Sequence, residues 1–156
     1  MYMTKKEPHL ASTRAACYMI LIKHNKVCLI LRSNTGYRDG EWALPSGKVD
    51  LDETFSQSAV RELSEEVSVT TQVLNIEHAI TSHRKSDNEP GVAWADVYFV
   101  CKSWKGEPYN AEPHKHEELR WFDVDDLPDN LMDYQRKALE AWRIGNKYIE
   151  IGWETK

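Results

Sequence analysis

The segment GKVDLDETFSQSAVRELSEEVSV, from Gly47 to Val69, carries the strongest information in the chain. From Thr54 to Val67 it contains neither glycine nor proline, and Thr54 or Asp52 can cap a first helical turn. We therefore predict a helix over 54–67. On a wheel that advances about 100° per residue from Glu62, its apolar side chains span an arc from roughly 20° to 160°, the face that packs on a core.

Three glutamates lie on or beside that apolar face. Glu66 falls inside the arc at about 40°, whereas Glu62 at about 0° and Glu65 at about 300° flank it. Burying one carboxylate beside others costs free energy through desolvation and repulsion. Either Arg61 and nearby lysines form salt bridges on a solvated face, or a hard divalent cation, Mg²⁺ or Mn²⁺, binds oxygens at i, i+3 and i+4. The position of Glu66 favours the cation.

The spacing of these residues resembles the Nudix box, GX5EX7REUXEEXGU, in which U is aliphatic. The matching positions are Gly47, Glu53, Arg61-Glu62-Leu63, Glu65-Glu66 and Val69. A chance match has a probability below about 10⁻⁹ per starting position at average residue usage. Ser68 replaces the late glycine of the box, which costs about 1 kcal/mol if this residue adopts a left-handed conformation.

The resemblance implies an α/β fold, the Nudix-like α/β/α sandwich with a mixed β-sheet and a catalytic helix at about 54–68. It also implies metal-dependent hydrolysis of a nucleoside diphosphate linked to another group. Glu62 and Glu66 would ligate the metal directly, and Glu65 directly or through water. Arg61 would orient these glutamates, Glu53 would brace the loop against the helix, and a main-chain carbonyl of Ser46 or Gly47 would add a ligand.

The rest of the chain is consistent with a mixed sheet that has helices on its faces. A hairpin is expected from Arg14 to Arg32, with His24-Asn25 as its turn, and Trp42 to Leu44 is a short apolar run that ends at Pro45. Further strands are expected at Thr71–Thr81, Val92–Lys102 and Leu119–Val124, and a second helix at Leu131–Ile144, ended by Gly145. A β-sandwich without a real helix is the alternative.

Length and composition indicate one domain, residues 1–156. We expect it in the cytoplasm. The net charge of −5 argues against a nucleic-acid polymer or an anionic membrane as partner. The longest apolar run, Tyr18 to Ile22, is too short to span a membrane, and Met1 to Pro8 lacks a signal-peptide core. Cys17, Cys28 and Cys101 lie in apolar runs without metal-site spacing, so we expect reduced core cysteines.

The general base is open, because the family uses either a box glutamate or one on a distant loop. Glu117 and Glu118 are the candidates outside the box, and we choose Glu118 over the alternative that both are solvated loop charges. His114 and His116 could mimic a metal pair, but we expect them to be solvated loop residues.

Substrate contacts are expected from residues around the box. Arg32 and Arg38 flank a glycine-containing loop and could contact phosphates. Tyr37, Trp42 and Trp94 could stack on a base, although for each of them core packing is the stronger expectation. Asp133 and Tyr134 are weaker candidates for base recognition, since an acid at a helix start is often only a favourable charge.

The resemblance to the Nudix family, together with these residues, implies a Mg²⁺-dependent pyrophosphohydrolase, which we expect to be a monomer or homodimer. The expected substrate is a nucleoside triphosphate, with oxidised or noncanonical bases included, and the products are the monophosphate and pyrophosphate. ADP-ribose or nucleotide-sugar hydrolysis is the second choice. The sequence lacks the proline about sixteen residues past the box that marks ADP-ribose hydrolases in this family. It also lacks the tyrosine about seventeen residues past the box that marks dinucleoside-polyphosphate hydrolases. A nucleotide-binding module without catalysis is a third possibility, which the complete set of box glutamates disfavours.

Overall fold

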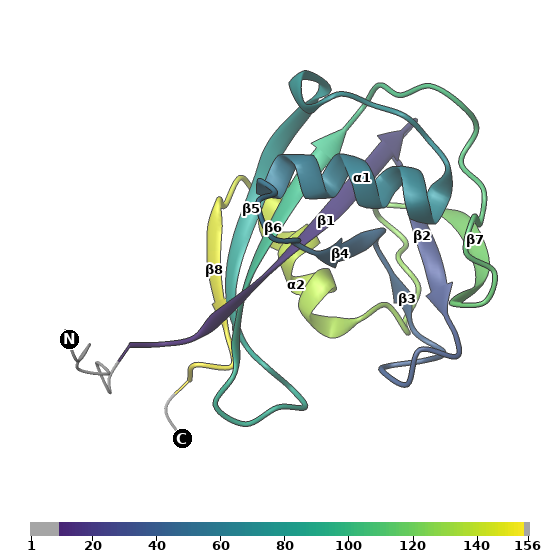
Figure 1. Ribbon diagram of the computed structural model, residues 1–156. Helices are drawn as coiled ribbons and strands as arrows, with labels where there is room; N and C mark the ends of the chain where they lie inside the picture. Colours follow the sequence, from purple (N-terminus) through teal and green to yellow (C-terminus); the bar gives the residue numbers. More distant parts are fainter. Residues whose placement is uncertain (1–9, 155–156) are drawn as a thin grey trace.

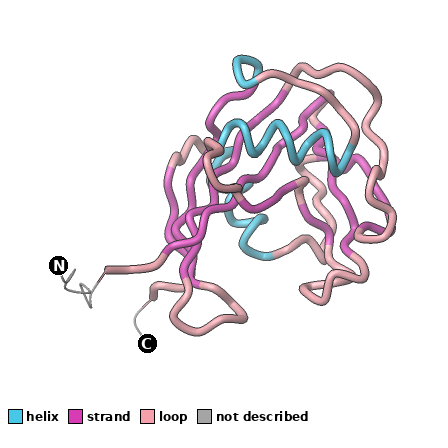
Figure 2. The backbone as a smooth tube through the Cα atoms, viewed as in Figure 1, coloured by secondary structure: helices cyan, strands magenta, loops and turns pink. Residues whose placement is uncertain are grey.

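The computed structural model describes residues 10–154, which fold into eight strands, two α-helices and one 3₁₀ helix (Figures 1 and 2). The strands are β1 (Thr13–Lys23), β2 (Lys26–Arg32), β3 (Trp42–Ala43), β4 (Ser46–Lys48), β5 (Ile76–Lys85), β6 (Ala93–Cys101), β7 (His116–Asp123) and β8 (Tyr148–Ile151). The helices are α1 (Phe55–Val67), the 3₁₀ helix η1 (Val73–Asn75) and α2 (Asp133–Arg143). Met1 to Pro8, where we expect no signal-peptide core, lies outside the described residues.

Strand β1 is the centre of a mixed sheet with the order β3-β2-β1-β6-β5-β8. It runs parallel to β6 and antiparallel to β2 and β4. Strand β7 lies outside this order and pairs antiparallel with β2. The β1–β2 turn places His24 and Asn25 at φ 51° and 60°, a conformation that favours the predicted tight hairpin.

The alternation of side chains along β1 divides the core into two layers. Cys17, Met19 and Leu21 pack in a cluster that includes the apolar face of α1, whereas Tyr18 and Ile20 pack in a second cluster with α2. Figure 1 shows α1 crossing one face of the sheet and α2 behind the other. The predicted α/β/α sandwich is thus confirmed, and the β-sandwich alternative is wrong.

Two predicted strands have different limits in the structure. The strand expected at 71–81 begins only at Ile76, because Val73 and Leu74 form η1 with their apolar side chains exposed. It continues to Lys85 because the polar residue Arg84 faces inward and is buried. Strand β7 begins at His116, before the predicted Leu119.

Two further strands escaped the sequence analysis. The segment Ser46–Lys48, expected to be only a stop signal, pairs with β1 as β4. The C-terminal segment Tyr148–Ile151 forms β8, which runs parallel to β5 at the sheet edge. Both are short, so the period-two pattern that identifies a strand is barely present.

Cys17, Cys28 and Cys101 are buried and unpaired, as predicted. In the described part of the chain, no helix combines the length and apolar character needed to cross a bilayer.

Candidate active site

Local sequence determines where the acidic helix α1 begins and ends. The Thr54 side chain accepts a hydrogen bond from the Gln57 N–H, and the Thr54 N–H donates to the Gln57 side chain, forming a capping box. At the other end Ser68 adopts φ 58° and ψ 32°, the left-handed conformation considered for this position of the box. The helix therefore ends at a residue type that is strained in this conformation.

Glu66 is the buried carboxylate of α1, as its place on the wheel predicts. Only 9% of the residue is exposed, and its Oε2 accepts a 2.8 Å hydrogen bond from the Ser46 N–H. Burial raises the pKa of Glu66 well above its usual value; the Ser46 bond opposes this rise, and Glu62 and Glu112 add to it. The ionised form of Glu66 therefore needs more positive charge than the Ser46 amide supplies.

Glu62 packs directly against Gly47 of β4. A Cβ at position 47 would clash with the Glu62 carboxylate, so only glycine lets this side chain lie against the strand. We expected a glycine here because the backbone approaches a metal ion, and the structure shows that it also makes room for a glutamate. Burial raises the pKa of Glu62, and its hydrogen bond from Arg61 opposes the rise.

Arg61 pairs with most of the other acids of the box. It donates to both carboxylate oxygens of Glu53, at 2.8 and 3.0 Å, and to Glu62 at 2.8 Å and Glu65 at 3.2 Å. These bonds from Arg61 lower the pKa of Glu53 to about 2. The salt-bridge interpretation therefore describes Glu53, Glu62 and Glu65, whereas Glu66 lies outside this network.

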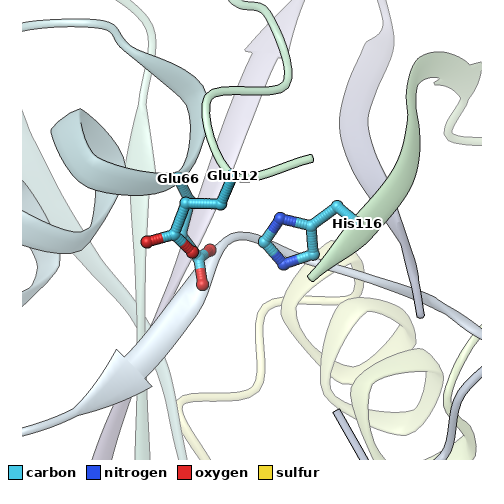
Figure 3. A group of neighbouring side chains, drawn as sticks. All are labelled: Glu66, Glu112 and His116. Atoms are coloured by element: carbon cyan, nitrogen blue, oxygen red, sulfur yellow. The ribbon is translucent and has the colours of Figure 1, made fainter. Parts of the chain in front are cut away.

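The loop before β7 brings two further groups to Glu66 (Figure 3). The Ala111 N–H donates a 3.0 Å bond to the main-chain oxygen of Glu66, which holds the loop against the end of α1. One ligand atom each from Glu66, Glu112 and His116 lies within 4.8 Å of the others. Figure 3 shows the His116 ring directed at the two carboxylates.

His116 corrects the expectation that both loop histidines are solvated. His114 is exposed, but His116 is 2% exposed and opens β7 opposite Arg32. Burial above all, with the nearby charge of Arg32 and Lys115, lowers the pKa of His116 to about 4. The sequence shows only a polar loop here, because the strand pairing that buries His116 involves a residue far away in the chain.

The structure does not place the predicted base, Glu118, in this group. Glu118 lies on β7 opposite Leu31, and its carboxylate pairs with Arg120 at 2.6 Å, both side chains being partly exposed. Glu117, the other candidate, is exposed. Glu112, which the sequence analysis did not single out, is the acid from outside the box that lies beside Glu66.

A cleft of about 380 Å³ opens beside β4 and brings together part of the predicted substrate contacts. The predicted residues that line it are Arg32, Tyr37, Ser46, Gly47 and Trp94, together with Tyr134. Trp94 has three cationic side chains near its ring: Arg14 at 5.5 Å, Arg84 at 5.8 Å and Lys48 at 5.9 Å from the ring centroid. The cleft thus combines an aromatic surface with local positive charge, in a chain that is acidic overall.

Three predicted substrate contacts do not line this cleft. Trp42 is 5% exposed and packs edge-on against Phe122, so it lies in the core, the stronger of its two expectations, and not in position to stack on a base. Arg38 and Asp133 pair with each other at 2.6 Å, so the acid is engaged at the helix start rather than directed into the cleft.

The floor of the cleft contains a buried ion pair that the sequence analysis missed. Arg84, which lines the cleft, donates to Asp96 beneath it at 2.6 Å, and both residues are almost fully buried. The Arg84 guanidinium also lies 4.0 Å from the centre of the Tyr134 ring. Arg84 and Asp96 are diagonal neighbours on β5 and β6, since Ser82 pairs with Asp96 and Arg84 with Trp94. Opposite charges on two adjacent predicted strands were the available signal.

The donor set fits a hard divalent cation. Glu66 supplies a buried carboxylate, Glu62 a half-buried one against the backbone of Gly47, and Glu65 a more exposed one. Carboxylate and carbonyl oxygens are the ligands that Mg²⁺ and Mn²⁺ prefer. A cation here would offset the burial and the repulsion between carboxylates that raise the pKa of Glu62 and Glu66.

Comparison with known proteins agrees with this geometry. The family model described as NUDIX domain matches residues 12–142. The chain is 30% identical to an ADP-ribose pyrophosphatase of Methanocaldococcus jannaschii over 81% of this chain and 72% of that protein. It is 26% identical to an 8-oxo-dGTP diphosphatase of Escherichia coli over 68% of this chain and 80% of that protein. A crystal structure of a MutT NUDIX hydrolase from Burkholderia pseudomallei superposes with a TM-score of 0.75 at 31% identity, covering 83% of this chain and 97% of the other.

Proposed function

The chain belongs to the NUDIX family of hydrolases, and from that premise we propose that it is a Mg²⁺-dependent pyrophosphohydrolase of nucleoside triphosphates. Water adds to one phosphorus, one P–O–P bond breaks, and the products are a nucleoside monophosphate and pyrophosphate. Oxidised and other noncanonical bases are included in the proposed substrate class. The buried carboxylate of Glu66 beside Glu62 is the observation that supports this proposal most strongly.

Glu62 and Glu66 would hold the metal, with Glu65 binding directly or through water and a main-chain carbonyl of Ser46 or Gly47 completing the set. Bound Mg²⁺ would neutralise phosphate charge and acidify the attacking water. The hydrogen bond from the Ser46 N–H fixes one oxygen of Glu66 and leaves the other free to bind. Mn²⁺ has similar ligand preferences and should substitute for Mg²⁺.

Arg61 and Glu53 are positioning residues in this proposal. Glu53 holds the guanidinium through two hydrogen bonds, and Arg61 in turn holds Glu62 and Glu65 on one side of α1. This arrangement orders the carboxylates before substrate arrives, which reduces the reorganisation needed for catalysis.

Glu112 is the proton acceptor that the geometry favours. It lies beside Glu66, whereas Glu118 pairs with Arg120 on β7. A carboxylate has two oxygens, so one can accept the proton of the water while the other contacts a cation. Glu118, the base predicted from the sequence, remains the alternative.

The cleft supports a nucleotide as substrate. Trp94 offers a ring for stacking a base, and Arg14, Arg32 and Lys48 supply local positive charge for phosphates. The Escherichia coli relative is named an 8-oxo-dGTP diphosphatase, which is consistent with a triphosphate. We place the enzyme in the cytoplasm, because its three cysteines are buried and unpaired. We further propose that it is a monomer or homodimer and that it binds no nucleic-acid polymer.

ADP-ribose hydrolysis is the second candidate. The relative from Methanocaldococcus jannaschii, 30% identical over 81% of this chain, is named an ADP-ribose pyrophosphatase. The same carboxylates would serve either substrate, because both contain a pyrophosphate bond. Selection between them would depend on the cleft around Trp94.

The test is hydrolysis of a panel that contains 8-oxo-dGTP, the common nucleoside triphosphates, ADP-ribose and nucleotide sugars, each with Mg²⁺ and with EDTA. Phosphorus NMR of the products in ¹⁸O-water identifies which phosphorus water attacks. Glu66→Gln should lose at least about 100-fold in turnover, and Glu77→Gln, an exposed acid on β5, should retain it. Absence of Mg²⁺-dependent release of phosphate or pyrophosphate from every member would overturn the proposal.

A further inference from the structure

His116 has a buried imidazole whose Nδ1 lacks a hydrogen-bond partner in the described part of the chain. Among residues 10–154, no group pairs with its Nδ1, although the residue is only 2% exposed. An unsatisfied buried polar atom is costly, and native structures seldom retain one without a ligand, ion or functional reason. Figure 3 shows that the ring is directed at the carboxylates of Glu66 and Glu112.

Main-chain contacts hold this group in place independently of any ligand. The Asn110 side chain donates to the His116 carbonyl oxygen at 2.6 Å, and the His116 N–H donates to the Glu112 carbonyl oxygen at 3.0 Å. The loop is fixed to α1 by the bond from Ala111 to the Glu66 carbonyl oxygen. The three side chains therefore converge because the backbone around them is fixed, which is how preorganised metal sites are built.

Two cationic side chains, Lys115 and Arg32, lie near the Glu66, Glu112 and His116 group. Lys115 pairs with Glu112 at 3.4 Å but is half exposed, and Arg32 lies near both Glu66 and His116. An imidazole nitrogen that no protein group occupies, such as Nδ1 of His116, has a lone pair that can bind a metal ion.

We propose that Glu66, Glu112 and His116 form a mixed oxygen and nitrogen site that binds a divalent transition-metal ion, such as Mn²⁺, Co²⁺ or Zn²⁺, more tightly than Mg²⁺. The inference rests on the proposed function in one respect, the role of Glu66 as a metal ligand. Imidazole is a ligand for transition metals, whereas Mg²⁺ prefers oxygen, so the nitrogen donor changes which ion the site selects.

The spacing permits this arrangement. The three ligand atoms lie within 4.8 Å of one another. Atoms bound to one ion at about 2.1 Å lie about 3 to 3.5 Å apart, so each side chain has to move by about 1 Å or less. Three protein ligands also leave positions open for water or a phosphate oxygen, which is the pattern of catalytic rather than structural metal sites.

The decisive measurement is pulsed electron paramagnetic resonance of Mn²⁺ on untagged, metal-stripped protein. A directly bound imidazole gives a nitrogen hyperfine coupling, which carboxylate ligands do not give. We expect this coupling in the wild type and in His114→Gln, the exposed histidine two positions away, and its loss in His116→Gln. Calorimetric titration should show Mn²⁺ affinity at least about 10-fold lower in His116→Gln, with Mg²⁺ affinity changed less than about 3-fold.

Each outcome bears on one proposal. Absence of nitrogen coupling in the wild type overturns the mixed site, even if Mg²⁺-dependent hydrolysis is intact, and would mean that His116 only contacts the carboxylates. Equal loss of Mn²⁺ and Mg²⁺ affinity in His116→Gln overturns the metal preference. Coupling without hydrolysis of any nucleotide overturns the proposed function and leaves the site standing. If His116→Gln does not fold, the wild-type spectrum alone decides.

Discussion

The backbone N–H of Ser46 donates a 2.8 Å hydrogen bond to Oε2 of Glu66, which connects β4 directly to α1. Strand β4 is in turn paired with β1 through Tyr18 and Cys17. The buried carboxylate is therefore positioned by the central strand of the sheet as well as by its own helix. Any change that displaces β4 should move Glu66 and alter metal binding.

Replacing Glu66 by Gln should stabilise the metal-free protein at neutral pH. Burial raises the pKa of Glu66, so the stability due to this group is fully present below the ordinary glutamate pKa of about 4.5 and is lost as pH rises through the raised pKa. In EDTA, Glu66→Gln should melt a few degrees above the wild type at pH 7, and the difference should vanish below about pH 4.5.

Melting in Mg²⁺ completes this test. Wild type should gain about 2.7 kcal/mol at a metal concentration one hundred times Kd, and the Glu62→Gln, Glu66→Gln double variant should gain little at matched ionic strength. Glu77→Gln controls for loss of an exposed acid. A wild type that is more stable than Glu66→Gln in EDTA at pH 7 would contradict the assignment.

Glu112→Gln and Glu118→Gln should affect turnover very differently. Glu112 lies beside Glu66, so its replacement should lower kcat by about 100-fold or more. Glu118 is paired with Arg120 on a partly exposed surface, so its replacement should change kcat less than about 3-fold. Steady-state kinetics at saturating Mg²⁺ measures both. The reverse order would restore Glu118 as the base.

Removing Arg61 should destabilise the fold. Arg61→Gln leaves Glu53 and Glu62 without their shared partner, at an expected cost of about 1 to 2 kcal/mol after allowance for solvent screening. Arg14→Gln is a control, because the Arg14–Glu89 pair is about half exposed and should contribute under about 1 kcal/mol. Urea denaturation compares the two, and equal effects would show that the Arg61 network adds nothing.

Ser68→Gly should stabilise the protein by about 0.5 to 1 kcal/mol, because glycine adopts a φ of 58° without strain. Ser64→Gly, in the exposed interior of α1, should instead cost about 0.5 kcal/mol. Because the two changes in stability have opposite signs, they distinguish relief of strain at the helix end from the general effect of introducing a glycine. A loss of stability in both variants would refute the strain at Ser68.

The thiols should be inert in the folded protein. Burial raises the pKa of Cys17 to about 11 and of Cys28 to about 12, and Cys101 is also buried. Cys17 and Cys28 therefore carry little thiolate at pH 7.5, and burial blocks reagent access to all three thiols. Ellman's reagent should label the cysteines slowly in buffer and completely in guanidinium. Rapid labelling in buffer would mean that the core opens readily.

The helix and the hairpin were predictable because their signals are local. Thr54, the apolar stripe of α1 and the His24-Asn25 turn act within a few residues, so their sequence patterns carry the structure. The same stripe identified Glu66 as a buried acid. Arg61 and Glu53 were recognised through the box, and their mutual hydrogen bonds agree with a bracing role.

The remaining parts of the site depend on contacts between distant segments. Backbone bonds from Tyr109 and Ala111 to the end of α1 bring Glu112 to Glu66, and the pairing of β7 with β2 buries His116. Trp42 and Trp94 are both large aromatic residues in apolar segments of the sequence, yet Trp42 lies in the core and Trp94 lines the cleft. Such differences arise from tertiary packing, which a single sequence does not encode at short range.

Parallel pairing of β1 with β6 delays folding during translation. Thr13 pairs with Ala93 and Leu21 with Cys101, so the first strand lacks this neighbour until residue 101 has been synthesised. Before then the chain can form the local β1–β2 hairpin, but the apolar residues on β1 remain accessible to water. We therefore expect chaperones to bind the nascent chain while it is still attached to the ribosome. The yield of folded enzyme in a cell should therefore depend on chaperone supply and on the rate of elongation through β6.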